Sequence, residues 1–106
     1  MSYLLVLTTA SSRKEALKLA DLILSKRLAA CINILPVMDS LYWWKGKKEK
    51  GREVQMFIKT RASAFKILAA QIRKNHAYSL PEIIAIPIAK GSKAYLGWIN
   101  KEVGPS

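Results

Sequence analysis

Few side chains in this sequence could perform chemistry, and the most reactive of them are its single histidine and single cysteine, His76 and Cys31. A thiolate could bind a soft metal such as Cu(I) or Zn(II), and a neutral imidazole is a common metal ligand. The two residues are 45 positions apart, so no ligand-spacing motif connects them. Taken alone, Cys31 could equally be a small buried apolar residue, and His76 a hydrogen-bonded loop residue.

No pattern in the sequence indicates a catalytic centre. A Ser–His–Asp or Cys–His arrangement is formally possible, but no local motif supports either. The segment 8–12, which follows the first predicted strand, contains no glycine and therefore does not form a Gly-rich phosphate loop. We expect a binding protein and not an enzyme.

Residues at the ends of predicted strands are candidates for a binding site. Glu82 follows Pro81 at the start of one strand, and Lys59 ends another. Side chains at strand ends can converge on one rim, where a small ion or anion could bind; a Lys59–Glu82 ion pair is the alternative. Aromatic residues, Tyr95 among them, could line the same cleft, although core or interface packing also accounts for them. The predicted cleft comprises Trp44, Glu53, Lys59, Tyr78 and Trp98.

The charge of the chain needs an interpretation, because its 106 residues carry a net charge of +11 from 18 basic and seven acidic side chains. Most basic residues are spread over two predicted helices. The densest cluster lies at the tip of a predicted hairpin and consists of Lys45, Lys47, Lys48, Lys50 and Arg52. We interpret the excess as a solvated surface with an aggregation-resistant tip, and we expect no specific nucleic-acid partner.

Length and composition indicate one domain in a reducing compartment. Half of the residues are hydrophobic (51%), which suffices for a packed core in a chain of this length. The lone Cys31 cannot form an intrachain disulfide, and no apolar run is long enough to span a membrane. We expect a cytoplasmic protein with no membrane partner.

Hydrophobic periodicity predicts the element order β-α-β-β-α-β-α. The predicted strands are residues 3–9, residues 30–35 bending at 37–39 into the first hairpin arm 40–44, the second hairpin arm 53–59, and residues 83–89. The predicted helices are residues 13–26 and 63–75, with a short third helix after Ser92. Ser12 and Glu15 have capping-box spacing, and Ser92 is a candidate cap of the last helix. Pro87 lies inside the last strand, which predicts an edge strand or a bulge.

This order predicts an α+β, ferredoxin-like fold with an extra C-terminal helix. The first strand and the second hairpin arm are expected side by side in the centre of the sheet, with both main helices on one face. Gly46 and Gly51 are expected to bracket the turn of the hairpin. The consecutive rings of Tyr42, Trp43 and Trp44 point to both faces of that hairpin, so we interpret it as an assembly element. The alternative is that the chain's own helices cover both faces.

Five segments, spread in order over nearly the whole chain, resemble the CutA, or divalent-cation-tolerance, family. They are RLAACIN (27–33), YWWKGK (42–47, a Tyr-x-Trp-x-Gly-Lys pattern), EVQMFIKT (53–60), HAYSLPEI (76–83) and YLGWI (95–99). The resemblance implies a homotrimer similar to the PII signalling proteins, in which the hairpin extends to a neighbouring subunit. It also implies a role in tolerance to copper and other divalent cations.

The resemblance also implies metal ligands. His76 matches the family's histidine and Cys31 its second-strand cysteine, with Glu82 as a further candidate, so we expect contacts to copper or another divalent cation. Thr8 stands where some bacterial members with a copper site carry a cysteine, and Asn75 where a second histidine can stand. The alternative function is a PII-like signalling or scaffold trimer that binds a small anion or a partner protein.

Overall fold

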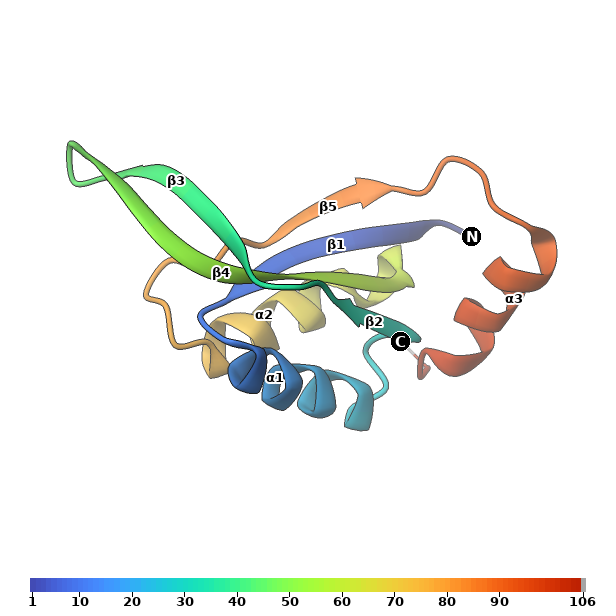
Figure 1. Ribbon diagram of the computed structural model, residues 1–106. Helices are drawn as coiled ribbons and strands as arrows, with labels where there is room; N and C mark the ends of the chain where they lie inside the picture. Colours follow the sequence, from blue (N-terminus) through green and yellow to red (C-terminus); the bar gives the residue numbers. More distant parts are fainter. Residues whose placement is uncertain (106) are drawn as a thin grey trace.

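The computed structural model describes residues 1–105, which form an antiparallel sheet with three α-helices (Figure 1). The sheet order is β2-β4-β1-β5, and β3 pairs with the outer part of β4. The strands are β1 (Tyr3–Ala10), β2 (Cys31–Ile34), β3 (Met38–Trp44), β4 (Lys47–Arg61) and β5 (Ile84–Pro87). The helices are α1 (Arg13–Ser25), α2 (Phe65–Asn75) and α3 (Lys93–Glu102), with a 3-10 turn (Ala62–Ala64) before α2. In residues 1–105 no helix is both long and apolar enough to cross a membrane.

Local sequence signals set the helix ends and the sheet edge. The Ser12 hydroxyl accepts a 3.1 Å hydrogen bond from the backbone N–H of Glu15, and Ser92 does the same for Tyr95. Both predicted caps are therefore confirmed. The prediction of an edge strand is also confirmed: β5 pairs only with β1 in the described sheet, and Pro87 is its last residue, opposite Leu4. Proline fits there because an edge strand has no ladder bond to donate on its outer side.

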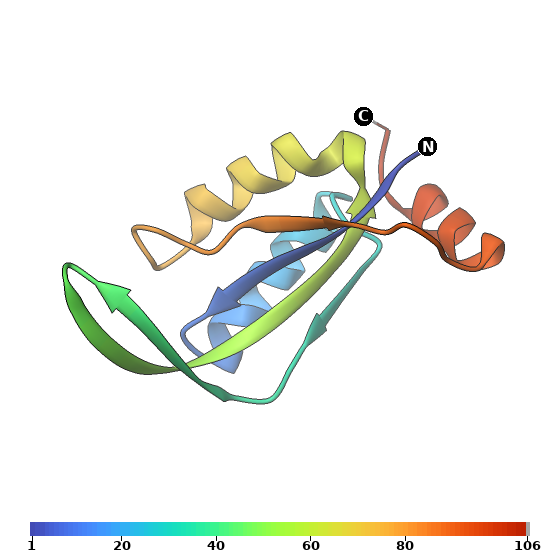
Figure 2. The same cartoon turned by 90° about the horizontal axis from the view of Figure 1, so that it is seen from above.

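The core lies between the sheet and helices α1 and α2, which cover the same face (Figures 1 and 2). Every second residue of β4 points into it, and Val54, Met56 and Ile58 are almost completely buried. Ile23 of α1 and Ile72 of α2 are also fully buried. The apolar side chains at every second position of the strand thus pack against the apolar stripes of the two helices, which repeat about every 3.6 residues, as the sequence predicts.

The opposite face of the sheet carries a row of apolar side chains with no helix over its middle. Leu7 lies opposite both Phe57 and Ile84, and Leu5 lies opposite Ile86. Ile84 and Ile86 are about half exposed, at 53% and 48%. Helix α3 packs at the end where β1 begins and β4 ends, leaving the centre of this face open (Figure 1). We call these five residues the open face.

The hairpin formed by β3 and β4 extends away from the body (Figures 1 and 2). Its turn consists of Lys45 and Gly46, which both have positive φ, at 51° and 78°. The prediction that Gly46 and Gly51 bracket a basic loop was therefore wrong for Gly51, which lies within β4 opposite Ser40. A two-residue turn closes a twisted hairpin, and lysines on a ribbon exposed to solvent do not prevent strand pairing.

Candidate functional site

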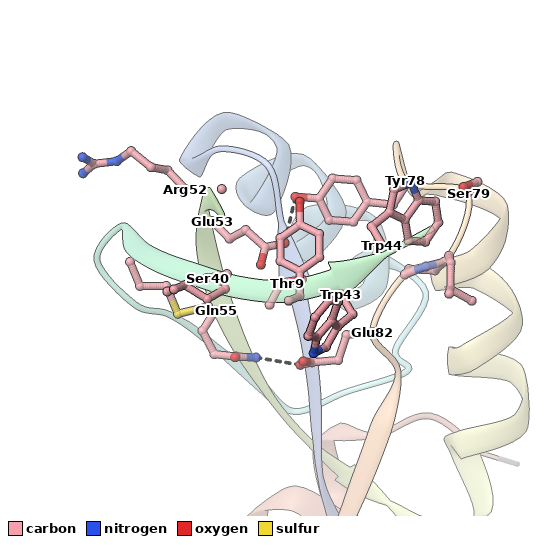
Figure 3. Close-up of a pocket in the computed structure, with 16 residues that line it drawn as sticks. Thr9, Ser40, Trp43, Trp44, Arg52, Glu53, Gln55, Tyr78, Ser79 and Glu82 are labelled. Atoms are coloured by element: carbon pink, nitrogen blue, oxygen red, sulfur yellow. Dashed lines mark hydrogen bonds between the residues drawn. The ribbon is translucent and has the colours of Figure 1, made fainter. Parts of the chain in front are cut away.

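A groove of about 720 Å³ lies between the hairpin and the segment 78–82 that leads into β5 (Figure 3). Its volume is within the range of small-molecule sites, about 300–1,000 Å³. The connection from α2 to β5 forms one wall of the groove, and the hairpin forms the opposite wall. The outer part of β4 forms the floor. The lining side chains with aromatic or acidic groups are Tyr42, Trp43, Trp44, Glu53, Tyr78 and Glu82.

Gln55 joins the walls of the groove. It follows Glu53 on the same face of β4, because alternate residues of a strand share a face. The Gln55 side-chain amide donates to the backbone carbonyl of Thr8 at 2.9 Å and to Oε2 of Glu82 at 3.2 Å. These two bonds attach β1 and the segment before β5 to β4. Neither Gln55 nor Thr8 was among the predicted site residues; the alternation of side chains from Glu53 along the strand was the signal available for Gln55.

His76, Tyr78 and Glu53 form a connected set of hydrogen bonds. The Tyr78 hydroxyl donates to Oε2 of Glu53 at 2.9 Å. The backbone N–H of Tyr78 donates to Nδ1 of His76 at 3.0 Å, and Nε2 of His76 lies 2.6 Å from the carbonyl oxygen of Thr9. Since Nδ1 accepts and a carbonyl can only accept, the arrangement assigns the proton to Nε2 of a neutral imidazole.

The ionisation of Glu53 and Tyr78 follows from this set of bonds. Burial raises the pKa of Glu53, but hydrogen bonds from the hydroxyls of Ser40, Tyr78 and Thr9 outweigh it, so the pKa of Glu53 lies below the ordinary 4.5. Burial, followed by the hydrogen bond and charge of Glu53 and a smaller effect of Tyr42, raises the pKa of Tyr78 to about 12. At neutral pH the pair therefore consists of a carboxylate and a neutral phenol.

The three predicted metal ligands do not converge within one chain. Both ring nitrogens of His76 already take part in hydrogen bonds. Cys31 lies opposite Lys59, whereas Glu82 binds Gln55, and these β4 residues are four positions, or about 13 Å, apart. Residues 1–105 contain no group of three or more His, Cys, Asp or Glu side chains that could hold a metal ion.

The predicted cleft is divided between two places. Trp44, Glu53 and Tyr78 line the groove, but Lys59 and Trp98 do not. Lys59 is six residues beyond Glu53 on β4, about 20 Å along the strand. Its ammonium lies 5.6 Å from the ring centroid of Tyr95, whose ring is 5.4 Å from that of Trp98. The single cleft is therefore corrected to a groove at the hairpin and a separate cluster at α3, because one long strand holds the two apart.

The alternative of a Lys59–Glu82 ion pair is also wrong. Within the described chain, residues 1–105, the single salt bridge joins Arg27 and Glu102, at 3.4 Å. Lys59 faces the ring of Tyr95, and Glu82 accepts from the neutral amide of Gln55.

A sheet with one open apolar face, a protruding hairpin and a groove at the base of that hairpin define a small α+β domain. Residues 4–102 match the family described as CutA1 divalent ion tolerance protein. The chain belongs to this family, which confirms the resemblance found in the sequence.

Individual relatives agree with this assignment. The chain is 39% identical over 103 residues to Protein CutA 1, chloroplastic, of Oryza sativa, covering 97% of this chain and 58% of that protein. It is 38% identical over 99 residues to the divalent-cation tolerance protein CutA of Thermus thermophilus, covering 93% and 96%. The crystal structure of CutA1 from Oryza sativa superposes with a TM-score of 0.97 at 38% identity, covering 100% of this chain and 97% of that one. The chain thus spans little more than half the length of Protein CutA 1, chloroplastic, of Oryza sativa.

Proposed function

We propose that this protein serves in divalent-cation tolerance as a homotrimeric binding protein rather than as an enzyme. The observation that carries the proposal is the combination of an open apolar sheet face with an exposed aromatic hairpin. We describe the fold as ferredoxin-like, since β1 and β4 are the central neighbours of the sheet and helices α1 and α2 lie on one face of it (Figure 1).

The assembly argument uses two different apolar surfaces. The open face holds Ile84 and Ile86 half exposed, and the hairpin exposes Leu41 at 78% and Trp43 at 70%. A contact between the hairpin of one copy and the open face of the next copy is heterologous, which means that it joins two different surfaces of the same protein. Repeated around an axis, such contacts close into a ring, and a ring of three agrees with the family resemblance.

We propose that contact with copper or a related divalent cation is weak. To bind His76, a metal must first displace the hydrogen bond to Thr9 or the one from Tyr78. Cys31 and Glu82 stand apart from His76 in one chain, so they contribute either separately or from a neighbouring copy.

One experiment tests the metal contact. The purified protein is titrated with Cu(I), Cu(II) and Zn(II), and His76→Ala is compared with Asn75→Ala, which alters an exposed neighbour bonded to Gln71. We expect weak saturable binding that His76→Ala reduces and Asn75→Ala preserves. Equal affinities in the two variants would remove His76 from the metal site.

The mass in solution tests the assembly, on the same samples. We expect three chains for the native protein. Ile84→Lys should lower the mass, whereas Ile67→Lys should not, although Ile67 on α2 is equally exposed, at 54% against 53%. A native monomer, or equal masses for both variants, contradicts the proposed interface.

The basic hairpin tip supports a second candidate, a signalling or scaffold trimer that binds a small anion or a partner protein. Lys45 and Gly46 form the turn, and the neighbouring basic side chains, Lys47, Lys48, Lys50 and Arg52, are exposed on β4. A variant with the five basic residues replaced by serine should lose partners in a pulldown. Identical partner sets for variant and native protein contradict a role for the tip. Cytoplasmic location remains a prediction that rests on the unpaired thiol of Cys31.

A further inference from the structure

The groove carries two carboxylates that the protein does not neutralise with a salt bridge. In residues 1–105 the only salt bridge is the distant Arg27–Glu102 pair, although the chain has 18 basic side chains. Glu53 accepts from the neutral hydroxyl of Tyr78, and Glu82 from the neutral amide of Gln55. The lowered pKa of Glu53 agrees with a carboxylate that stays charged in this place. The groove is thus a negative site on a strongly positive protein.

The nearest basic side chain of the lining is directed elsewhere. Arg52 lies at the edge of the groove, but alternate residues of a strand point to opposite faces, so it projects from the other side of β4 than Glu53. Figure 3 shows its guanidinium pointing away from Glu53 and Glu82. In the two-stranded hairpin, Arg52 of β4 lies directly opposite Asp39 of β3. A cation from outside can therefore approach both carboxylates.

Aromatic rings complete the site. Tyr42, Trp43, Trp44 and Tyr78 all line the groove, and ring faces attract cations within about 6 Å. The hairpin already shows such a contact, since the ammonium of Lys45 lies 5.9 Å from the centroid of Trp44. A hard divalent ion prefers six or more oxygen ligands. Two carboxylates among rings match an organic cation better, because rings bind cations and carbon chains but coordinate hard metals poorly.

The arrangement along β4 indicates the shape of the ligand. Glu53 and Gln55 are two residues, or about 7 Å, apart along the strand, and Gln55 holds Glu82. Apolar side chains, including Met38 and Leu80, line the remaining surface. Negative charges separated along an apolar groove suit a short carbon chain with a cationic group at each end.

We propose that the groove binds a small organic cation, with primary ammonium or guanidinium groups at Glu53 and Glu82 and its carbon chain against the aromatic wall. This site lies within one chain and requires no bound metal, so it goes beyond the metal contact proposed above. Trp43 of its aromatic wall also belongs to the proposed contact between copies, so the ligand is tested on the native assembly.

The test is a calorimetric titration of the native assembly with putrescine as probe. Butanediol, which has the same carbon chain but hydroxyls in place of the amines, is the uncharged control. We expect saturable binding of putrescine and at least about tenfold weaker binding of butanediol, the effect of losing a charge-assisted hydrogen bond. Glu82→Gln and Glu53→Gln should each weaken putrescine binding by about tenfold. Glu49→Gln, which removes an equal charge from the exposed hairpin outside the lining, should change it less than about twofold.

Three results would overturn the proposal. These are equal binding of putrescine and butanediol, no loss of affinity in Glu82→Gln, or no saturable putrescine binding to the folded native protein. Because Glu53 supports the hairpin base, Glu82→Gln and Trp44→Leu keep the test decisive if Glu53→Gln does not fold. Solution mass measured in the same experiment separates failure of this site from failure of the trimer.

Discussion

The hydroxyl of Tyr78 donates a 2.9 Å hydrogen bond to Oε2 of Glu53, which lies 25 positions earlier in the chain. This bond joins the loop after α2 to β4 at the base of the hairpin. It therefore couples the two walls of the groove, and it also fixes which member of the pair carries charge.

Removing the phenolic hydroxyl with Tyr78→Phe should leave the ring in place and take away one donor from the Glu53 carboxylate. We expect the free energy of unfolding to fall by about 1–2 kcal/mol, the range for a partly exposed bond to a charged group. Urea unfolding measures this change. Tyr95→Phe is the control, since its ring is similarly near a charge, and it should cost less. Equal losses in the two variants would mean that the Tyr78–Glu53 bond contributes nothing specific.

The pH dependence of stability has a defined sign at both ends of the scale. Glu53 has a lowered pKa in the folded state. Its contribution to the free energy of unfolding is therefore present above pH 4.5 and is lost as the pH falls through the folded pKa. Tyr78 has a pKa raised from 10.0 to about 12, so its contribution is present below pH 10 and is lost as the pH rises towards 12. The difference in unfolding free energy between native protein and Tyr78→Phe should shrink in both windows. A difference that is constant with pH contradicts the assigned ionisation.

His76 serves as a structural connector in the chain described here, because it bonds the backbone at Thr9 and at Tyr78. His76→Ala leaves a carbonyl and an N–H without these partners, and we expect a loss of about 2–3 kcal/mol in unfolding free energy. Asn75→Ala breaks only exposed contacts with Gln71 and should cost less than about 1 kcal/mol. Thermal and urea unfolding check the order of the two variants. A smaller loss for His76→Ala than for Asn75→Ala contradicts this role.

Two glycine substitutions should change stability in opposite directions. Gly46 has φ 78° in the hairpin turn, so Gly46→Ala forces a β-carbon into the left-handed region and should cost about 1–2 kcal/mol. Gly97 lies inside α3, and an added β-carbon there meets nothing within 4 Å. Gly97→Ala should therefore stabilise the protein by about 0.5–1 kcal/mol. Melting temperatures of the two variants on the same side of the native value would contradict this.

The sequence predicted features that depend on neighbouring residues. Ser12 and Ser92 cap helices as expected, because a cap needs only its own first turn. Pro87 marks the edge strand for an equally local reason, its missing N–H. The central position of β1 and β4 followed from the element order and the handedness of the connections.

The groove was harder to predict, because its contacts depend on how distant elements align. Gln55 reaches Glu82 only through the alignment of β4 with the segment before β5, and no local pattern specifies that alignment. Glu53 and Lys59 both lie in the predicted arm 53–59, and the prediction of a single cleft overlooked the distance of about 20 Å between them along the strand. The proposed roles of the site residues in binding stay predictions.

The continuity of β4 also has a consequence for the order of events in folding. Trp44 and Lys47 pair across a two-residue turn, whereas Val6 and Ile58 are 52 positions apart in the sequence and still lie side by side. Short hairpins close in about 1–10 μs, and long loops close more slowly because more chain entropy is lost. The same strand therefore contains both a rapid local pairing and a slower long-range pairing. We expect the rate-limiting step to be the arrival of β1 between β4 and β5, with the protruding hairpin already formed.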